Sequence, residues 1–128
     1  MIAADSLTKS FDGFTALNHI SCTIPRGCIY GLVGSNGAGK STFLRLLAGI
    51  YRPDSGSVTL EGQPIFENPG IKSRLAFVPD DWYFLNGASI RRMADLYRAA
   101  YPTFDTARYR CLVETFRLDE KKPLNHFS

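Results

Sequence analysis

The sequence has 128 residues, a formal net charge of +3 and three cysteines. That length suits one domain built around one core. Hydrophobic residues make up 45% and charged residues 21%, which is ordinary for a globular protein and excludes the disordered and fibrous classes. The lysines and arginines are spread along the chain and form no basic block, so we expect no nucleic-acid partner.

The compartment is indicated by three further features. The sequence has no run of about 18 uninterrupted apolar residues, and its start, Met1-Ile2-Ala3-Ala4-Asp5, has neither the basic nor the apolar region of a secretion signal. The three cysteines form no C-x-x-C pair, which favours idle thiols in a reducing compartment over a metal or redox site. We therefore expect a cytoplasmic location.

Strands are predicted on both sides of an early turn. Residues 1–8 are a plausible strand, and apolar residues alternate with small polar ones over residues 20–24, which is typical of a half-buried antiparallel strand. Asp12-Gly13 between them indicates a turn. Pro25-Arg26-Gly27 then turns the chain into residues 28–33, a nearly continuous apolar run that predicts a strand covered on both faces of a parallel sheet.

A glycine-rich loop follows this run. Gly34, Gly39, Lys40 and Ser41 fit the phosphate-loop pattern G-x-x-x-x-G-K-[ST]. Glycines permit positive φ and carry no Cβ, so successive backbone N–H groups can converge on phosphate oxygens. Lys40 would reach the β- and γ-phosphates, and the Ser41 hydroxyl is placed to ligate Mg²⁺. We expect a phosphate cradle that opens a helix, with the positive end of the helix facing the anion.

The helix and strands after the loop are predicted from the glycine, proline and turn residues that separate them. Residues 42–48 are good helix formers, and Gly49 supplies a stop signal. The turn-rich residues 52–56 precede a strand-like segment at 57–60. Residues 74–79 read as another short buried strand that ends at a proline.

The last third of the chain is helical in pattern. Apolar residues recur at spacings of three and four over residues 89–101, which predicts an amphipathic helix. A second helix is expected after Asp105, a candidate N-cap, with an apolar stripe at Tyr109, Leu112, Val113 and Phe116. We expect residues 1–86 to form a β-rich nucleotide-binding core and residues 87–128 to start a helical subdomain.

Four segments in order give the chain its resemblance to the N-terminal part of an ATP-binding cassette (ABC) ATPase domain, over essentially all 128 residues. They are residues 7–13 followed by Ala16-Leu17, residues 34–42, residues 47–49 followed by 53–58 and Gly62, and Phe77-Val78-Pro79. The resemblance implies an α/β fold with a partial P-loop NTPase-type core, an N-terminal antiparallel β part and a C-terminal helical subdomain. It also implies that ATP contacts Phe11, Gly34, Ser35, Asn36, Gly37, Ala38, Gly39, Lys40, Ser41 and Thr42.

Phe11 and Asp80 hold positions that the resemblance makes functional. The family has an aromatic ring that stacks on adenine at the position of Phe11, more often a tyrosine, and stacking needs only the ring; a core phenylalanine near a turn is the alternative. At Asp80 the family has a glutamine that touches Mg²⁺. An aspartate offers a hard oxygen ligand, so we expect metal contacts from Ser41 and Asp80, with a solvated loop acid at Asp80 as the alternative and neighbouring Asp81 a second candidate.

Trp82-Tyr83-Phe84-Leu85 is unusually apolar for a loop. In the family this region borders the groove that receives a transmembrane subunit, and exposed aromatic residues are typical of interfaces. Closure of the core between the sheet and the helical part is the competing interpretation, and both stay open.

The resemblance also defines what the sequence lacks. The family completes its site with a serine-glycine-rich signature, an acidic strand beside the phosphate-loop strand, and a switch histidine. Phe127-Ser128 resembles the first two residues of the signature, and a missing acidic strand would leave an unpaired edge on a buried sheet. We therefore expect a fragment of a longer protein.

The implied function is that of an ATPase subunit of an ABC transporter, which couples ATP binding and hydrolysis to transport. Its implied cofactors are ATP and Mg²⁺, its implied partners are a second ABC ATPase domain and a transmembrane subunit, and its implied location is the inner face of the membrane. Two alternatives are a nucleotide-binding module without turnover, because the acidic strand is absent from these 128 residues, and a soluble ABC ATPase that does not serve transport. A small P-loop kinase and a GTPase fit less well.

Overall fold

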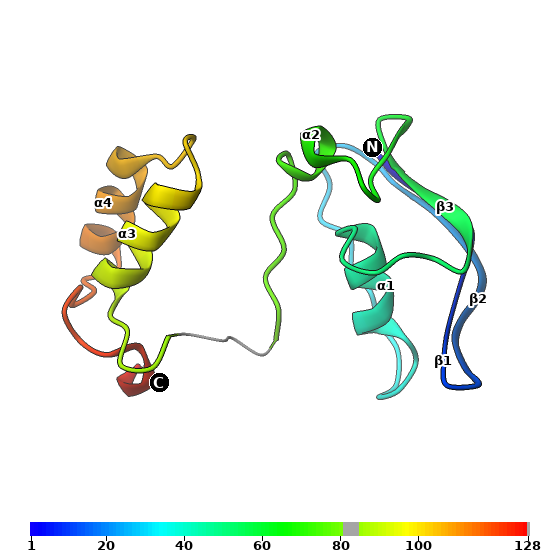
Figure 1. The fold of residues 1–128 in the computed structure, drawn as a ribbon, viewed down its shortest axis with the longest axis horizontal. Helices are drawn as coiled ribbons and strands as arrows, with labels where there is room; N and C mark the ends of the chain where they lie inside the picture. Colours follow the sequence, from blue (N-terminus) through cyan, green and yellow to red (C-terminus); the bar gives the residue numbers. More distant parts are fainter. Residues whose placement is uncertain (81–84, 128) are drawn as a thin grey trace. The chain divides into compact units, whose positions relative to one another are not determined.

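A computed structural model describes residues 1–80 and 85–127, and the chain forms two compact units, Met1–Val78 and Pro79–Ser128 (Figure 1). The boundary between these compact units falls after Val78. The boundary between a nucleotide-binding core and a helical subdomain, placed from the sequence between residues 86 and 87, remains a prediction. Asp81, the second candidate metal ligand, and Trp82, Tyr83 and Phe84, for which an interface and closure of the core both stayed open, lie outside the described residues.

The first unit is built on an antiparallel sheet of four strands in the order β2-β1-β3-β4. The strands are β1 (Ile2–Phe11), β2 (Phe14–Ile24), β3 (Ser55–Leu60) and β4 (Gln63–Pro64). The three strands predicted from the alternation and turn signals are confirmed, and each is longer than its pattern suggested. The predicted turn at Asp12-Gly13 is confirmed as well, since both residues have positive φ, 46° and 83°, as tight hairpin turns require.

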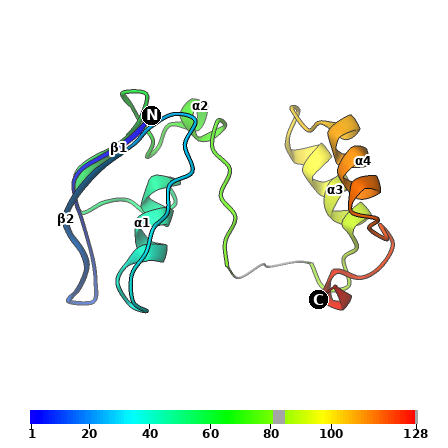
Figure 2. The same ribbon diagram turned by 180° about the vertical axis from the view of Figure 1, so that it is seen from behind.

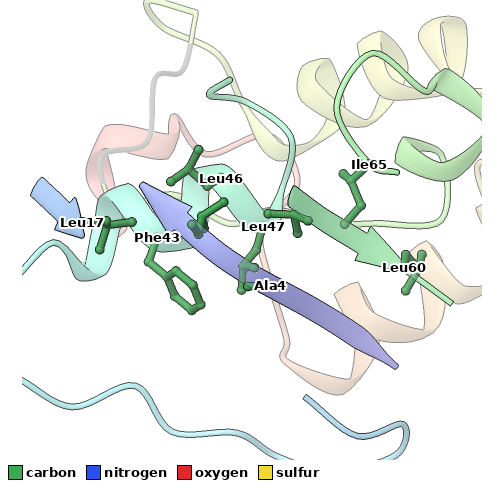
Figure 3. Close-up of a cluster of buried hydrophobic side chains, with 9 residues drawn as sticks. Ala4, Leu17, Phe43, Leu46, Leu47, Leu60 and Ile65 are labelled. Carbon is green, nitrogen blue, oxygen red and sulfur yellow. The ribbon is translucent and has the colours of Figure 1, made fainter. Parts of the chain in front are cut away.

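Helix α1 (Lys40–Leu47) packs beside this sheet, and the short α2 (Pro69–Lys72) follows β4; both views show α1 alongside the strands (Figures 1 and 2). The core between them contains nine buried side chains, several of which converge from the helix and the strands in Figure 3. Leu7, Leu46 and Ile65 are fully buried. They join β1, α1 and the segment after β4, so hydrophobic burial fixes the helix against the sheet.

Two predicted strands are absent from the structure. Residues 28–33 and 74–79 have no strand conformation, and Ile29 and Val33 are 103% and 94% exposed. A parallel strand takes its hydrogen bonds from neighbouring strands, and in the described residues no strand pairs with either segment. The predictions of a strand at residues 28–33, covered on both faces of a sheet, and of a strand at residues 74–79 are therefore wrong for the described structure.

A pocket of about 180 Å³ accompanies this lack of pairing. Its walls are largely apolar and come from β2, from the segment before the glycine loop and from the start of α1. The pocket is partly open to solvent, and the side chains of Tyr30, Leu32 and Val33 line it without filling it.

The second unit is a pair of helices, α3 (Ile90–Ala100) and α4 (Thr106–Thr115), followed by the 3₁₀ turn η1 (Leu124–His126). Both predicted helices are confirmed. Asp105 caps α4 as predicted, because its carboxylate accepts a hydrogen bond of 2.9 Å from the N–H of Arg108, and Ser89 caps α3 at 3.4 Å. Half of the residues in the predicted apolar stripes are exposed in the described structure, among them Leu112 at 45% and Phe116 at 65%.

None of the helices formed by residues 1–80 and 85–127 is long and apolar enough to cross a membrane.

Candidate nucleotide-binding site

The glycine loop presents backbone donors at the start of α1. Gly39 is the N-cap residue of the helix, in the left-handed region at φ 82°, and makes no side-chain capping bond. The N–H of Phe43 donates to the Gly39 carbonyl at 2.8 Å, so helical bonding begins immediately after the loop. The first N–H groups of a helix have no partner inside the helix. With the helix dipole behind them, they form a ready site for an anion.

Lys40 lies folded over this loop. Its ammonium donates to two loop carbonyls, to Gly34 at 2.8 Å and to Ser35 at 2.7 Å. These two bonds hold a positive charge beside the backbone donors of the loop. Because an ammonium has three donors, one remains for a phosphate oxygen while both carbonyl bonds are kept.

Gly39 also joins the loop to the sheet. A Cβ at this position would lie 2.5 Å from the backbone oxygen of Ala16 and 2.9 Å from the Leu17 side chain, closer than such atoms can approach. Position 39 therefore requires glycine for two reasons, its positive φ and its close contact with β2. The β1–β2 hairpin, which contains Phe11, is thereby held directly against the phosphate loop.

Phe11 is the last residue of β1, and its partner across the turn is Phe14. Its side chain is 39% exposed, so the ring is neither a closed core residue nor fully solvated. It packs edge-on against Tyr51, with ring centroids 5.5 Å apart and an interplanar angle of 66°. Figures 1 and 2 both show the β1–β2 turn and the glycine loop at the same end of the first unit.

The remaining predicted site residues are divided between the two units. Asn36, Gly37 and Ala38 are exposed in the loop, and Ser41 is exposed in the first turn of α1. Asp80 is exposed and belongs to the second unit. The geometry of the first unit therefore gathers the predicted ATP contacts from residues 34–42 and joins Phe11 to them through β2, and it does not include Asp80.

The metal ligand offered here, the Ser41 hydroxyl oxygen, suits magnesium better than a metal that needs three or four ligands from the protein. Among the described residues, no group of three or more His, Cys, Asp or Glu side chains could hold a metal ion. Mg²⁺ commonly keeps several waters and takes one or two protein oxygens together with substrate phosphates. The exposed Ser41 hydroxyl, next to the backbone donors for those phosphates, fits such an ion.

An ion pair joins β1 to the segment after α1. The Asp54 carboxylate accepts hydrogen bonds from the Lys9 ammonium and from the Ser10 N–H, both at 2.7 Å. The bond from Lys9, followed by the backbone bond from Ser10, lowers the pKa of Asp54. This side chain joins the segment after α1 to Lys9 and Ser10, the two residues that precede Phe11 in β1.

Sequence reasoning missed Tyr51, Ala16 and the Lys9–Asp54 pair as parts of this site. Asp54 stood in a turn-rich segment, where an aspartate needs no tertiary partner to be explained. Tyr51 gave no signal, because an aromatic residue after a helix is compatible with any core. Ala16 belongs to a segment quoted for the family resemblance, but its contact with Gly39 is made through a backbone oxygen.

The fold and the loop define a partial P-loop NTPase core. The family model described as "ABC transporter" matches residues 17–127, and the chain belongs to that family. It is similar to the ABC transporter ATP-binding protein YtrB of Bacillus subtilis, with 34% identity over 128 residues that cover 100% of this chain and 44% of that protein.

The chain is also similar to one protein over a single segment and to one solved structure in its fold. A putative ribose/galactose/methyl galactoside import ATP-binding protein of Agrobacterium fabrum is 48% identical over 65 residues, 51% of this chain and 13% of that protein. The solved ATP-binding subunit of an ABC transporter superposes with a TM-score of 0.83 at 24% identity over 100% of this chain and 56% of the other; this likeness concerns the fold alone. The chain thus spans about half the length of YtrB and of this solved subunit.

Proposed function

We propose that this chain is the ATP-binding part of an ABC transporter ATPase, in which residues 34–42 hold the phosphates and Phe11 stacks on adenine. The observation that carries the proposal is the glycine loop, whose uncapped backbone donors begin α1 under the Lys40 ammonium. The oxygens of a triphosphate would accept hydrogen bonds from such donors. Phe11, the last residue of β1, is 39% exposed, and its ring would supply a flat apolar face for the base.

Magnesium completes the proposal for the phosphates. When bound, Mg²⁺ neutralises charge that develops on the γ-phosphate. Ser41 would hold it through its hydroxyl, and the family resemblance alone supports Asp80 as a further oxygen ligand. The chain's own contribution is electrostatic, since the loop donors and Lys40 hold the phosphate chain in place for attack by water.

For the whole protein we propose ATP hydrolysis coupled to transport. Family membership and the printed names of the relatives, two of which are an ABC transporter ATP-binding protein and a putative sugar import ATP-binding protein, support it. The proposed partners are a second ABC ATPase domain and a transmembrane subunit, and the proposed location is the cytoplasmic face of the membrane. ATP would then act by favouring one of two states of the assembly.

The decisive variant is Lys40→Ala, measured by calorimetric titration of the full-length protein with Mg-ATP. Loss of the ammonium should weaken ATP binding at least tenfold, because charge-assisted bonds to phosphate are strong and this one lies among aligned donors. Lys121→Ala is the matched control, since Lys121 is an exposed lysine of the second unit. Equal ATP affinity in the two variants would overturn the proposal.

Binding without turnover is the alternative function for these 128 residues. The acidic strand with which the family completes its site is not found in these 128 residues, and this favours the alternative. Phosphate release should be compared between the full-length protein and residues 1–128 at saturating Mg-ATP. Release by the full-length protein alone would support hydrolysis as a property of the whole domain, and equal release by both would exclude the alternative.

A further inference from the structure

The Phe11 ring is fixed by contacts that do not come from its own strand. It lies beside a two-residue turn, where a half-exposed side chain would ordinarily change rotamer freely. Instead the ring of Tyr51 meets it at 5.5 Å in an edge-to-face arrangement. Such aromatic pairs contribute about 0.5–1.5 kcal/mol beyond the area they bury.

Tyr51 is itself anchored to the helix that begins at the phosphate loop. Its N–H donates to the Arg45 carbonyl at 3.2 Å, and the Arg45 guanidinium lies over its ring, 5.8 Å from the centroid. Tyr51 also packs against the buried core of the first unit. These contacts tie Tyr51, which follows α1 in the chain, to Arg45 of the helix and to the core.

Lys9 supplies a second constraint on Phe11. The Lys9 ammonium lies 5.4 Å from the Phe11 centroid and is held there by Asp54 at 2.7 Å. Asp54 follows Tyr51 by three residues, so one short segment after α1 contacts Phe11 directly and also through Lys9. More than a third of the Phe11 side chain still remains exposed, which leaves ring surface for a ligand.

We propose that Tyr51 is a positioning residue, which holds the Phe11 ring in the orientation that stacks on the nucleobase. This inference rests on the proposed function, because it assumes that Phe11 is the base platform. Fixing a side chain before binding removes the cost of ordering it, about 0.5–1.5 kcal/mol per side chain. Tyr51 thereby couples the base platform to α1, whose first turn holds the phosphates.

The test compares two ligands, ATP and inorganic tripolyphosphate, on the full-length protein. Their affinity ratio reports the base contact, because the phosphates are common to both. Phe11→Ala should lower the ratio about fivefold or more, since base stacking is worth about 1–3 kcal/mol. Tyr51→Ala should lower it about two- to tenfold, and Tyr51→Phe, which keeps the ring, should restore it. Tyr101→Ala, an exposed tyrosine of the second unit, is the control and should leave the ratio unchanged.

The outcomes separate the inference from the function beneath it. If Phe11→Ala lowers the ratio but Tyr51→Ala does not, Phe11 is the platform and the positioning role of Tyr51 is wrong. If Phe11→Ala itself leaves the ratio unchanged, the proposed base contact fails first. A loss of affinity for both ligands in Tyr51→Ala, at a constant ratio, would assign Tyr51 a purely structural role and also overturn the inference.

Discussion

The two units of the chain are stabilised in different ways. The first contains nine buried apolar side chains from the sheet, α1 and the segment after β4, whereas among the described residues of the second only Ala88 and Ala94 are buried to that degree. The second is held instead by caps and polar contacts, such as the hydrogen bond from the Tyr109 hydroxyl to Glu120 and the Arg91–Glu120 ion pair at 3.6 Å. The phosphate loop therefore belongs to the unit in which hydrophobic burial fixes the positions of the backbone.

Among the predicted changes, removal of a core side chain from the first unit should lower the free energy of unfolding most. Leu46 is 2% exposed, so Leu46→Ala removes buried methyl groups and leaves a cavity, and we expect a loss of about 2–5 kcal/mol in the free energy of unfolding. Leu112→Ala in the second unit is the matched change at a side chain that is 45% exposed, and it should cost less than about 1 kcal/mol. Denaturant titration measures both, and equal losses would show that the contrast is wrong.

The joint between loop and sheet should give the next largest effect. Gly39→Ala places a methyl group 2.5 Å from the Ala16 oxygen and forces alanine into the left-handed region, so we expect about 2–3 kcal/mol of destabilisation together with weaker ATP binding. Gly37 has a similar φ of 83°, but the Cβ added by Gly37→Ala meets no atom within 4 Å, so this change should cost only about 1 kcal/mol. Equal thermal stabilities of Gly39→Ala and Gly37→Ala would mean that the close contact of Gly39 with β2 does not affect stability.

Helix caps should have a smaller effect, confined to the second unit. Asp105→Ala removes the bond to the Arg108 N–H and should cost about 1 kcal/mol. Amide hydrogen exchange should accelerate in the first turn of α4 and remain unchanged in α1. Thr103→Ala, at an exposed residue just before the cap, serves as the control. Faster exchange throughout both units would contradict an effect confined to the cap.

The smallest predicted effect is a pH dependence in the second unit. Burial, followed by the hydrogen bond to Glu120, raises the pKa of Tyr109 to about 12. The folded pKa exceeds the unfolded value of about 10, so this contribution to stability is complete below pH 10 and is lost as the pH rises through 12. The ultraviolet difference spectrum between the protein and Tyr109→Phe should show ionisation of this hydroxyl near pH 12, and ionisation near 10 would refute the assignment.

The parts of the fold that the sequence predicted are those with local causes. The helix after the glycine loop, the Asp12-Gly13 turn and the Asp105 cap each depend on residue types within a few positions of one another. Propensity, capping and turn chemistry act over that range. For these features a single sequence carried enough information.

The parts that failed depend on distant neighbours. The apolar run at residues 28–33 has the composition of a buried strand, but a strand forms only where another strand pairs with it, and the described residues provide none. Likewise the contacts of Tyr51 with Phe11 and of Ala16 with Gly39 join positions 40 and 23 residues apart. Neither periodicity nor a motif encodes such contacts, so only the folded chain shows them.

The central claim, that the backbone of the glycine loop cradles a triphosphate, is tested most directly by nitrogen-15 NMR of the full-length protein. On addition of Mg-ATP, the amide signals of Gly37, Gly39 and Lys40 should move strongly to lower field, because their N–H groups would donate to phosphate oxygens. The amide of Gly87, in the second unit, should stay in place. ATP binding that leaves the three loop amides unmoved would contradict the account.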